Sequence, residues 1–594
     1  MTATAQAGIL AFGPQPVKDT MAHESVDAEF TDSLLSDYTL DGSPHTLETP
    51  ADLRELPVPG KLVFTKVSGA SLTADFVVTG IEFGDPLDAT PVTETVAFAG
   101  DTVLRTTKVF RAVTSIAVPA GVGRVFRIGH RMAPVAFRHR AADIDLSAID
   151  DVRMGPMEIG GVPVPTFPYK GGQLVTGGAT LYPRLESSFL YLLWGAVGFK
   201  EGQELAGGVT YLYEEGVINE EAIAAIIDSH ALTVGASTVL AAAMLEQPSD
   251  PSRITVRRSM ADAGTPWTGN VVITGTDSAD AALVETLTFG SGSGAAETDI
   301  LETEGLFKTL VSVEFPGYTT GATDLADVGY AMYDHVFTYN PGEGLAACLP
   351  WMSFYKFIPS GACTPNSTDS LWEEYEDCKI AGMQLTLPND GPIVSRFDVL
   401  GRKWHFSETN PLTYMGEYED YQSVPVGCHT GGWIKIPTYS ASELPVVSAQ
   451  LSMANTPLDI RQEKVYGSPD LDDITIVSRA VGIDLVVKWR DPDLYRKIYT
   501  GSVDGTEWSE KPFVESLDVL AVSNSHPFDC ASPWKLRLEC PSVLFQIGGG
   551  VRLAGNQAVM LRMTGTAIAP SNDATPYVTV TLTNRDRLYR WPTS

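Results

Sequence analysis

The chain has 594 residues, of which 44% are hydrophobic and 19% charged, which excludes a disordered chain and indicates roughly two to four folded domains. It carries 41 basic and 73 acidic residues, a net charge of −32, so tight binding to nucleic acid phosphates or to an anionic membrane is not expected. The 54 glycines and 39 prolines, with few long amphipathic runs, predict a mainly β fold of many short strands.

Residues 1–40 are polar and irregular, which predicts an N-terminal arm that orders on a partner. This segment lacks the basic start and apolar core of a secretory signal, and no apolar run in the chain is long enough to span a bilayer. We therefore expect synthesis in a cytoplasm and no membrane partner. Six cysteines, none in a CxxC pair, are expected to be free thiols there: Cys348, Cys363, Cys378, Cys428, Cys530 and Cys540.

Two stretches share four landmarks in the same order, which indicates an internal duplication. Alternating strands with Gly/Asp turns predict a small β-sandwich at 41–131 and a second one at 228–337. The offsets between landmarks are 185, 195, 191 and 197 residues, for the pairs His45 with His230, Gly80 with Gly275, Glu94 with Glu285, and Phe110 with Phe307.

The second stretch contains Thr274-Gly275-Thr276-Asp277 and then Glu285-Thr286-Leu287-Thr288, which resembles the immunoglobulin-like β modules of phage structural proteins. The first stretch departs from this pattern at Ile81-Glu82, so a different turn is expected there. The paired histidines are compatible with a ligand-binding role. The duplication alone accounts for their recurrence, however, and structural hydrogen bonding is the favoured interpretation.

A helix is predicted between the two stretches. Leu185, Phe189, Leu192 and Leu193 follow the spacing i, i+4, i+7, i+8, which is typical of one amphipathic helix. Pro183 and Gly195 fit its first turn and its C-terminal cap, respectively.

The stretch Glu373–Trp404 predicts an antiparallel hairpin. Apolar residues alternate from Met383, the turn at Pro388–Pro392 includes Gly391, which can adopt a positive φ, and Gly401 closes the second strand. The first strand begins with four acids that we interpret as an exposed strand edge, namely Glu373, Glu374, Glu376 and Asp377.

The sequence contains no HExxH, P-loop, GxSxG or helix-opening GxGxxG motif. Asp470, Asp472 and Asp473 lack EF-hand spacing and are interpreted as a solvated turn. The four acids of the hairpin have no second group converging on them for acid–base catalysis. We therefore expect no enzyme activity, no cofactor and no metal site.

Several pieces of the chain, in order, resemble the bacteriophage major tail tube protein family. The second module lies between two of these pieces, so it is interpreted as an insertion into a tube domain at 132–227 and 338–594. The pieces are Leu181–Gly198 as a helix, His335-Val-Phe337, Leu349–Phe354, Tyr375-Glu-Asp-Cys378-Lys379, Gly401-Arg402-Lys403, Gln450–Asn455, Arg479–Leu494, Leu536–Pro541 and Gln557–Arg562.

The resemblance implies a virion structural protein whose subunits form stacked rings, typically hexameric, around a β-barrel channel that conducts DNA without binding it specifically. It also implies contacts with tape measure, terminator and tail tip proteins, and a location in the virion tail after assembly in the host cytoplasm. The arm at 1–40 and the loop Gly361–Ser370 are candidates for contacts between rings, and the acids and glycines of the hairpin for contacts within a ring.

Two other classes stay open at this point. One is a different phage tail, adaptor, baseplate or surface adhesive protein built from β modules, which would not stack into rings. The other is a carbohydrate-active enzyme on a β-sandwich scaffold, which would need a cleft with paired carboxylates.

Overall fold

A computed structural model of the chain confirms the prediction of a mainly β protein, with two α-helices among its described residues. In that part of the chain no helix is long and apolar enough to cross a membrane. The structure describes residues 8–15, 18–19, 21, 29–40, 43–48, 60–69, 73–82, 90–99, 103–121, 123–132, 136–154, 168–185, 188–198, 211–215, 217–219, 222, 224–232, 236–248, 252–259, 267–277, 280–289, 299–303, 305, 307–317, 325–339, 349–359, 371–408, 411, 415–417, 432–437, 440–459, 462–490, 492–522, 534–548, 551, 558–570, 575–584 and 588–592.

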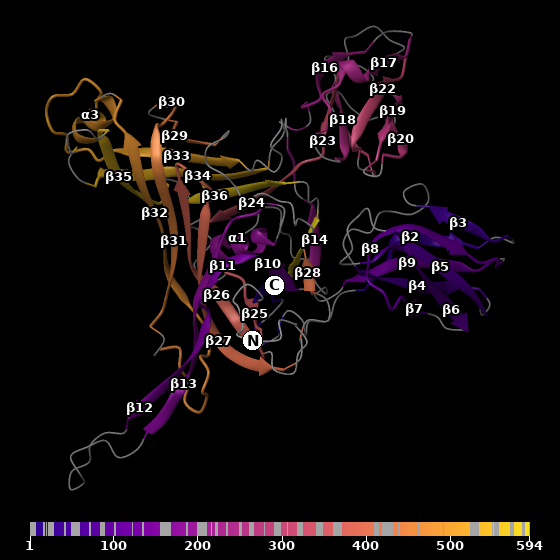
Figure 1. Ribbon diagram of the computed structural model, residues 1–594, viewed down its shortest axis with the longest axis horizontal. Coiled ribbons are helices and arrows are strands. Elements are labelled where there is room, and N and C mark those ends of the chain that lie inside the picture. The colour runs from indigo at the N-terminus through magenta and orange to yellow at the C-terminus, as the bar shows by residue number, and fades with distance from the viewer. Residues whose placement is uncertain are drawn as a thin grey trace.

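Figure 1 shows a large β domain and two separate lobes beside it, whose strands span 29–132 and 227–330. The predicted bounds 41–131 and 228–337 therefore omit Glu29–Thr39 from the first lobe and wrongly assign Tyr333–Tyr339, which pairs in the large sheet, to the second. The first module has its own core of buried apolar side chains, in which the rings of Phe64 and Phe76 lie 5.1 Å apart. Its strands are β2 (Glu29–Thr39), β3 (His45–Glu48), β4 (Gly60–Ser68), β5 (Thr73–Glu82), β6 (Val92–Ala99), β7 (Val103–Arg105), β8 (Phe110–Val118) and β9 (Val125–Met132).

The second module repeats this arrangement. It consists of β16 (Ile227–Ala231), β17 (Thr238–Ala241), the 3₁₀ turn η2 (Ala242–Met244), β18 (Ile254–Ser259), β19 (Gly269–Thr276), β20 (Ala282–Phe289), β21 (Asp299–Glu302), β22 (Thr309–Phe315) and β23 (Leu325–Tyr330).

Strand order shows that the two modules have the same topology. Among the described residues of the first, β2-β9-β4-β7 and β3-β8-β5-β6 are joined where Gly60 pairs with Phe110 and nowhere else. In the second, β16-β23-β18-β21 and β17-β22-β19-β20 are linked by one bridge between Ser252 and Phe307. Phe110 and Phe307 are one of the landmark pairs of the sequence, so the structure supports the duplication.

The histidine landmarks, however, were paired wrongly. His45 begins β3, whose counterpart β17 begins at Thr238, whereas His230 lies in β16, the counterpart of β2. The offset from His45 to Thr238 is 193 residues, within the range of the other three landmarks, whereas the histidine offset of 185 lay outside it. The recurrence of histidine is therefore coincidental.

In the large domain, β26 (Leu371–Pro388) and β27 (Val394–Ser407) form the predicted hairpin, with Trp372 opposite Ser407 and Thr386 opposite Val394. The other side of β26 pairs first with β25 and then with β31, so this strand is central. The remaining strands are β1 (Ile9–Pro14), β10 (Ala136–His139), β11 (Ala141–Ile144), β12 (Ser147–Met154), β13 (Pro168–Leu181), β15 (Val217–Ile218), β24 (Tyr333–Tyr339), β25 (Met352–Ile358), β28 (Met415–Glu417), β29 (Trp433–Ile436), β30 (Ser440–Glu443), β31 (Val446–Pro457), β32 (Ile476–Lys488), β33 (Val514–Val522), β34 (Lys535–Ile547), β35 (Met560–Ala567) and β36 (Val578–Asn584), with a separate pair β14 (Tyr211–Glu215) and β37 (Leu588–Pro592).

The predicted helix is α1 (Phe189–Val197), and it contacts β26, β24 and β36. All its residues are buried, so it is a core helix and not the amphipathic helix that was expected. Pro183 and Leu185, which were assigned to the helix, precede it. Gly195 lies inside it, where a Cβ would come within 2.6 Å of Ile380 Cδ1, and Gly198, with φ of 101°, ends it instead. A second helix, α3 (Asp493–Thr500), follows β32.

Two residues from pieces that carried the family resemblance meet at the C-terminus of α1. The Asn455 side-chain amide donates to Ala196 O and Ile380 O at 2.9 Å each, and the Arg479 guanidinium donates to Ala196 O and to Asn455 Oδ1. Carbonyls at a buried helix end need such donors, and a cation there also complements the helix dipole.

The prediction of a free arm at 1–40 is wrong for the described part of that segment. β1 lies between β10 and β25 in the large sheet, with Leu10 and Phe12 buried, and β2 belongs to the first module. The described cysteines, Cys378 and Cys540, are free and buried, as predicted. Cys348, Cys363, Cys428, Cys530 and the loop Gly361–Ser370 lie outside the described residues.

Candidate functional site

The acidic start of the hairpin lies inside the large sheet. Glu374, Glu376 and Asp377 are 7%, 6% and 0% exposed, and β25 and β27 flank them on both sides. Glu373 pairs with Lys356 at 2.8 Å and accepts a hydrogen bond from the Tyr375 hydroxyl. The interpretation of these four acids as an exposed edge is therefore wrong, because three of them are buried and Glu373 contacts Lys356 and Tyr375 of the same chain.

Asp377 occupies a bulge. The register between β25 and β26 shifts between Met352 and Phe354, and Asp377 has a φ of 53°, which non-glycine residues other than Asp and Asn rarely adopt. Its backbone N–H donates to Gln15 Oε1 at 3.1 Å, and its carboxylate accepts the Asp19 backbone N–H at 2.8 Å. The bulge thus directs a buried carboxylate toward the segment that follows β1.

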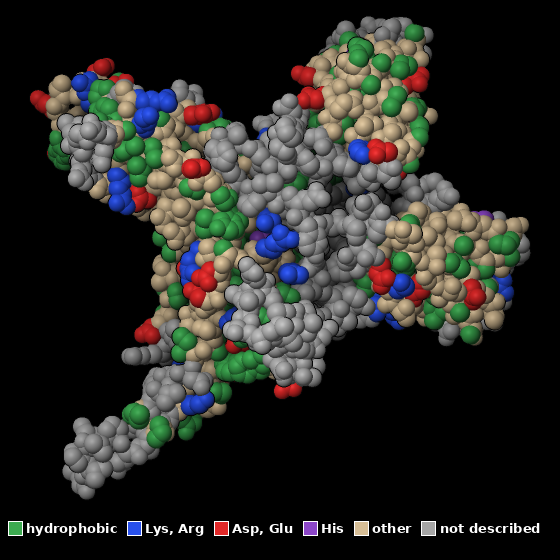
Figure 2. Space-filling model, viewed as in Figure 1, with side chains coloured by type: hydrophobic (Ala, Val, Ile, Leu, Met, Phe, Trp, Pro, Cys, Tyr) green, Lys and Arg blue, Asp and Glu red, His purple; other side chains and the backbone are tan. Residues whose placement is uncertain are grey.

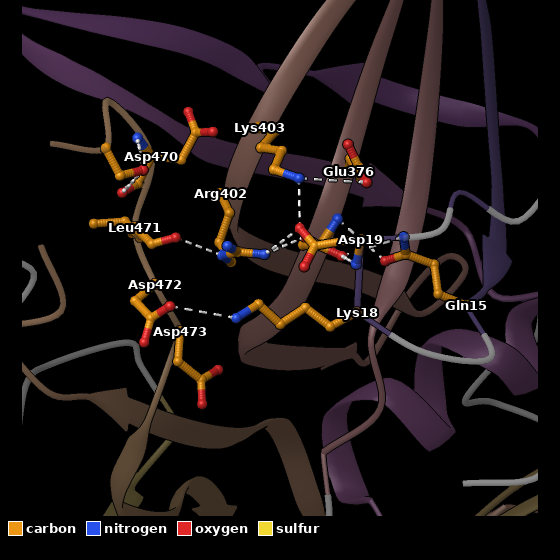
Figure 3. Close-up of polar contacts among 12 residues, drawn as sticks. Gln15, Lys18, Asp19, Glu376, Arg402, Lys403, Asp470, Leu471, Asp472 and Asp473 are labelled. Carbon is orange, nitrogen blue, oxygen red and sulfur yellow. Dashed lines mark hydrogen bonds and ion pairs between the residues drawn. The ribbon is translucent and has the colours of Figure 1, made fainter. Parts of the chain in front are cut away.

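Arg402 and Lys403, opposite on β27, complete a network of charges (Figure 3). The Arg402 guanidinium donates to the Asp377 carboxylate and, at 3.1 Å, to Asp19 Oδ1. Lys403 donates to the same Asp19 oxygen and lies 3.8 Å from Glu376, which also accepts from His405 Nε2 at 3.2 Å. Two cations, Arg402 and Lys403, thus contact three carboxylates, those of Asp19, Glu376 and Asp377.

The segment 458–475 closes the other side of this network. Arg402 Nε donates to Leu471 O at 2.6 Å, and Lys379 Nζ donates to Ile474 O at 2.8 Å. Asp472 and Asp473, interpreted from the sequence as a solvated turn, lie 3.6 Å and 3.5 Å from the amino groups of Lys18 and Lys379, respectively. The N-terminal segment, the hairpin and this loop are therefore held together at one point.

The ionisation of the network follows from its geometry. Partial burial opposes ionisation of Asp19, but hydrogen bonds from Lys403 and Arg402 prevail and lower the pKa of Asp19 to about 2. Burial raises the pKa of Asp377, and the Asp19 amide and Arg402 offset part of that rise. Burial also raises the pKa of the Cys378 thiol well above its ordinary value, so this thiol is not suited to act as a nucleophile.

Asp19, Glu376 and Asp377 have carboxylate oxygens within 4.8 Å of one another, a spacing that a metal ion could use. Arg402 and Lys403 already donate to two of these three carboxylates and lie beside the third. The arrangement is therefore an ion-pair network that fastens three segments, and its chemistry is structural.

The two glycines of the hairpin have distinct roles. Gly391 has a φ of 103° in the turn, as predicted, and a Cβ there would meet nothing within 4 Å. Gly401 was predicted to close the second strand, but it lies inside β27, which continues to Ser407. It is opposite Cys378, where a Cβ would come within 2.6 Å of Sγ and 3.0 Å of Val175 Cβ. Gly401 therefore permits β13, β26 and β27 to pack closely at the network.

Three residues of the network, Gln15, Lys18 and Asp19, were not identified from the sequence. They lie in the segment that was predicted to be a free arm, and more than 350 residues separate Asp19 from Asp377. No local pattern marks such a contact. The only sequence feature near them is the apolar run at Ile9–Phe12, which indicates a strand.

No protein-family model and no curated protein matches the chain. Among solved structures, the crystal structure of the PBSX exported protein XepA matches at 12% identity, over 52% of this chain and 87% of that chain, with a TM-score of 0.12. The VP2 subviral particle of infectious bursal disease virus matches at 9% identity, over 67% of this chain and 77% of that chain, with a TM-score of 0.11. Scores this low carry no argument about fold or function.

Proposed function

We propose that the chain is a structural subunit of a phage virion, specifically a tail tube protein whose copies form stacked, hexameric rings. Its partners are then other copies of itself and the tape measure, terminator and tail tip proteins, and its location is the virion tail. The channel passes DNA without binding it, in keeping with a net charge of −32. No catalytic role is assigned.

The observation that carries this proposal is a two-stranded ribbon that extends from the large domain (Figure 1). Residues 168–174 of β13 pair with β12 but with no other described strand, because β27 begins to pair only at Val175. A two-stranded ribbon is marginally stable on its own in water. Ile149 and Met154 on this ribbon are 48% and 66% exposed. Another copy of the chain that packs against the ribbon would both stabilise it and bury these two apolar side chains.

The base of the ribbon is braced, which fixes the direction in which it extends. Gln173 N donates to Pro469 O at 3.1 Å, and the Gln173 side chain donates to Asp470 at 2.5 Å. These contacts come from the same loop that closes the ion-pair network. The network therefore links the position of the ribbon to the central hairpin, as a ring contact between subunits requires.

Electron microscopy of the purified chain tests this function. We expect rings or tubes from the unmodified chain, and more than about ten-fold fewer particles from the double variant Ile149→Glu, Met154→Glu, because two carboxylates would be buried without partners in the contact. The control is Val67→Glu in the first module, where an apolar side chain is also exposed, at 45%. Monomers alone from the unmodified chain under every condition, or full assembly by the double variant, would refute the proposal.

A further inference from the structure

Each module has one outward sheet face with almost no charge, which we call its neutral face. In the first module this face belongs to β3-β8-β5-β6, and in the second to β17-β22-β19-β20. The carboxylates on these faces are few: Asp75 lies on the first and Glu314 on the second, and Glu48, at the end of β3, pairs with Ser115 at the edge of the first. Matched by strand register, the pairs of residues are Val77 with Val272, Thr79 with Thr274, Thr93 with Val284, Thr95 with Thr286, Ala97 with Thr288, and Ser115 with Ser312.

The opposite sheet of each module differs. In the second module its outer side carries the ion pairs Arg257–Asp327 at 2.7 Å and Arg253–Glu302 at 3.2 Å. In the first module it carries Arg105 and the half-buried Arg127. Figure 2 shows the lobe of the second module mostly in the colours of apolar and uncharged atoms, with acidic and basic groups near its margins. Both copies of the duplication thus keep one charged and one neutral face.

The chain has a net charge of −32, so two copies repel each other over most of their surfaces. The neutral faces are exceptions to this repulsion. An uncharged face is one place where two such copies can meet without burying like charges. The faces are open sheet surfaces without a described pocket, whereas sites for small molecules are concave. The exposed apolar side chains on them include Val284, which is 57% exposed. These properties fit a macromolecular partner that carries the same surface, namely a second copy.

We propose that the neutral face of the first module of one subunit packs on the neutral face of the second module of a neighbouring subunit. This contact rests on the proposed function, since it joins subunits that the tube already holds together. Because every chain carries one face of each kind, the contact is head-to-tail and can continue from subunit to subunit. The modules then form an outer layer that ties the assembly together.

The size of the faces explains why the contact needs the tube. Four strands at about 4.8 Å spacing and roughly five residues of about 3.4 Å each cover on the order of 300 Å². A stable interface between free proteins takes about 800 Å² from each partner. A contact this small is therefore weak between free chains, and it becomes effective when a second interface raises the local concentration.

Cross-linking between two variants of the full chain tests the contact. Thr95→Cys and Thr286→Cys place thiols at matched, exposed positions of the two neutral faces. The variants are assembled separately and as a mixture, and each sample is treated with a short bis-maleimide and imaged. We expect about ten-fold more cross-linked dimer in the mixture than in either variant alone, because only the mixture presents both thiols on facing subunits. Val67→Cys mixed with either variant is the control for nonspecific reaction.

Each outcome decides between the two proposals. Assembled particles with cross-linked dimer only in the mixture support the contact. Particles without that dimer, or with equal dimer from one variant alone, overturn the contact and leave the tube function standing. Absence of particles in every sample, including the unmodified chain, overturns the tube function and the contact with it. Adding Thr274→Asp to the Thr286→Cys chain should lower the dimer yield, since it places a carboxylate in the contact, and particles should still form.

Discussion

The two modules have the same strand order but fill their cores differently. The first contains four phenylalanine rings, Phe64, Phe76, Phe98 and Phe126, within 5.1–5.4 Å of their neighbours. At the matched positions the second has Val256, Val271, Phe289 and Ala326. It compensates with buried Trp267 and Arg258, whose guanidinium lies 5.5 Å from the Phe289 ring centroid and donates to Trp267 O.

Two buried aromatic positions, Phe98 with Phe289 and Phe110 with Phe307, and several polar contacts are shared by the modules. Thr106 and Thr303 each accept a backbone N–H from the matched residues Leu62 and Ile254, at 2.9 Å and 2.8 Å. Glu94 accepts backbone N–H groups of Thr107 and Lys108, and Glu285 accepts that of Gly305. The topology is thus kept by a few hydrogen bonds between loops and strands, whereas the rest of the apolar filling has been free to change as long as its volume is kept.

The largest difference between the modules is expected in the free energy of unfolding that each loses when a core side chain is truncated. Phe76→Ala should destabilise the first module by about 4 kcal/mol, whereas Val271→Ala should destabilise the second by about 2 kcal/mol, because the removed volume is smaller. Hydrogen exchange of the full chain, followed by mass spectrometry, reads each module separately. Equal losses in the two modules would contradict the idea that the first depends on its phenylalanine rings, and unchanged exchange in the other module is the control.

The second-largest difference is expected in acid, which should destabilise the first module more than the second. Burial lowers the pKa of His130 to about 4, whereas the second module has Tyr330 at the matched position. Since the folded value lies below the unfolded value of 6.5, this contribution to stability is complete above pH 6.5 and is lost as the pH falls toward 4. The free energy of unfolding of the first module falls by about 3 kcal/mol as a result.

Hydrogen exchange at pH 7 and at pH 4.5 measures this difference. We expect the first module to lose protection at the lower pH, and the variant His130→Tyr to lose much less of it. A loss of the same size in the variant would show that other groups cause the acid sensitivity. The second module, without a histidine at this position, is the internal reference.

The smallest effect should be the same in both modules. Thr106→Val and Thr303→Val each remove the acceptor of a buried backbone N–H, which should cost about 1–2 kcal/mol in either case. Exchange of the β4 and β18 amides measures it, with the exposed Thr114→Val as a control. Clearly unequal costs would mean that these hydrogen bonds do not have the shared role assigned to them.

The sequence predicted what is periodic or repeated, namely the mainly β fold, the hairpin β26–β27, the helix and the two modules. It failed where a tertiary contact decided the outcome. Gly195 looked like a helix cap, but it is a site of close packing against Ile380, and only Gly198 has the backbone angle of a cap. The acids from Glu373 to Asp377 looked exposed because Gln15 and Asp19, which cover Asp377, lie 362 and 358 residues away in sequence. Arg402 lies in the same predicted hairpin, but its ion pairs were not anticipated.

The position of β1 has a consequence for how the chain is made. Ile9–Pro14 pairs with Ala136–His139 on one side and with Met352–Ile358 on the other. This strand therefore cannot gain its second partner until more than 340 further residues have been synthesised. At roughly 5–20 residues per second, that delay is about 20–70 seconds. Both modules are fully synthesised before this delay ends, so they can fold before the large domain does. The large domain therefore closes only after β36, which pairs with β24 and β34, has been synthesised.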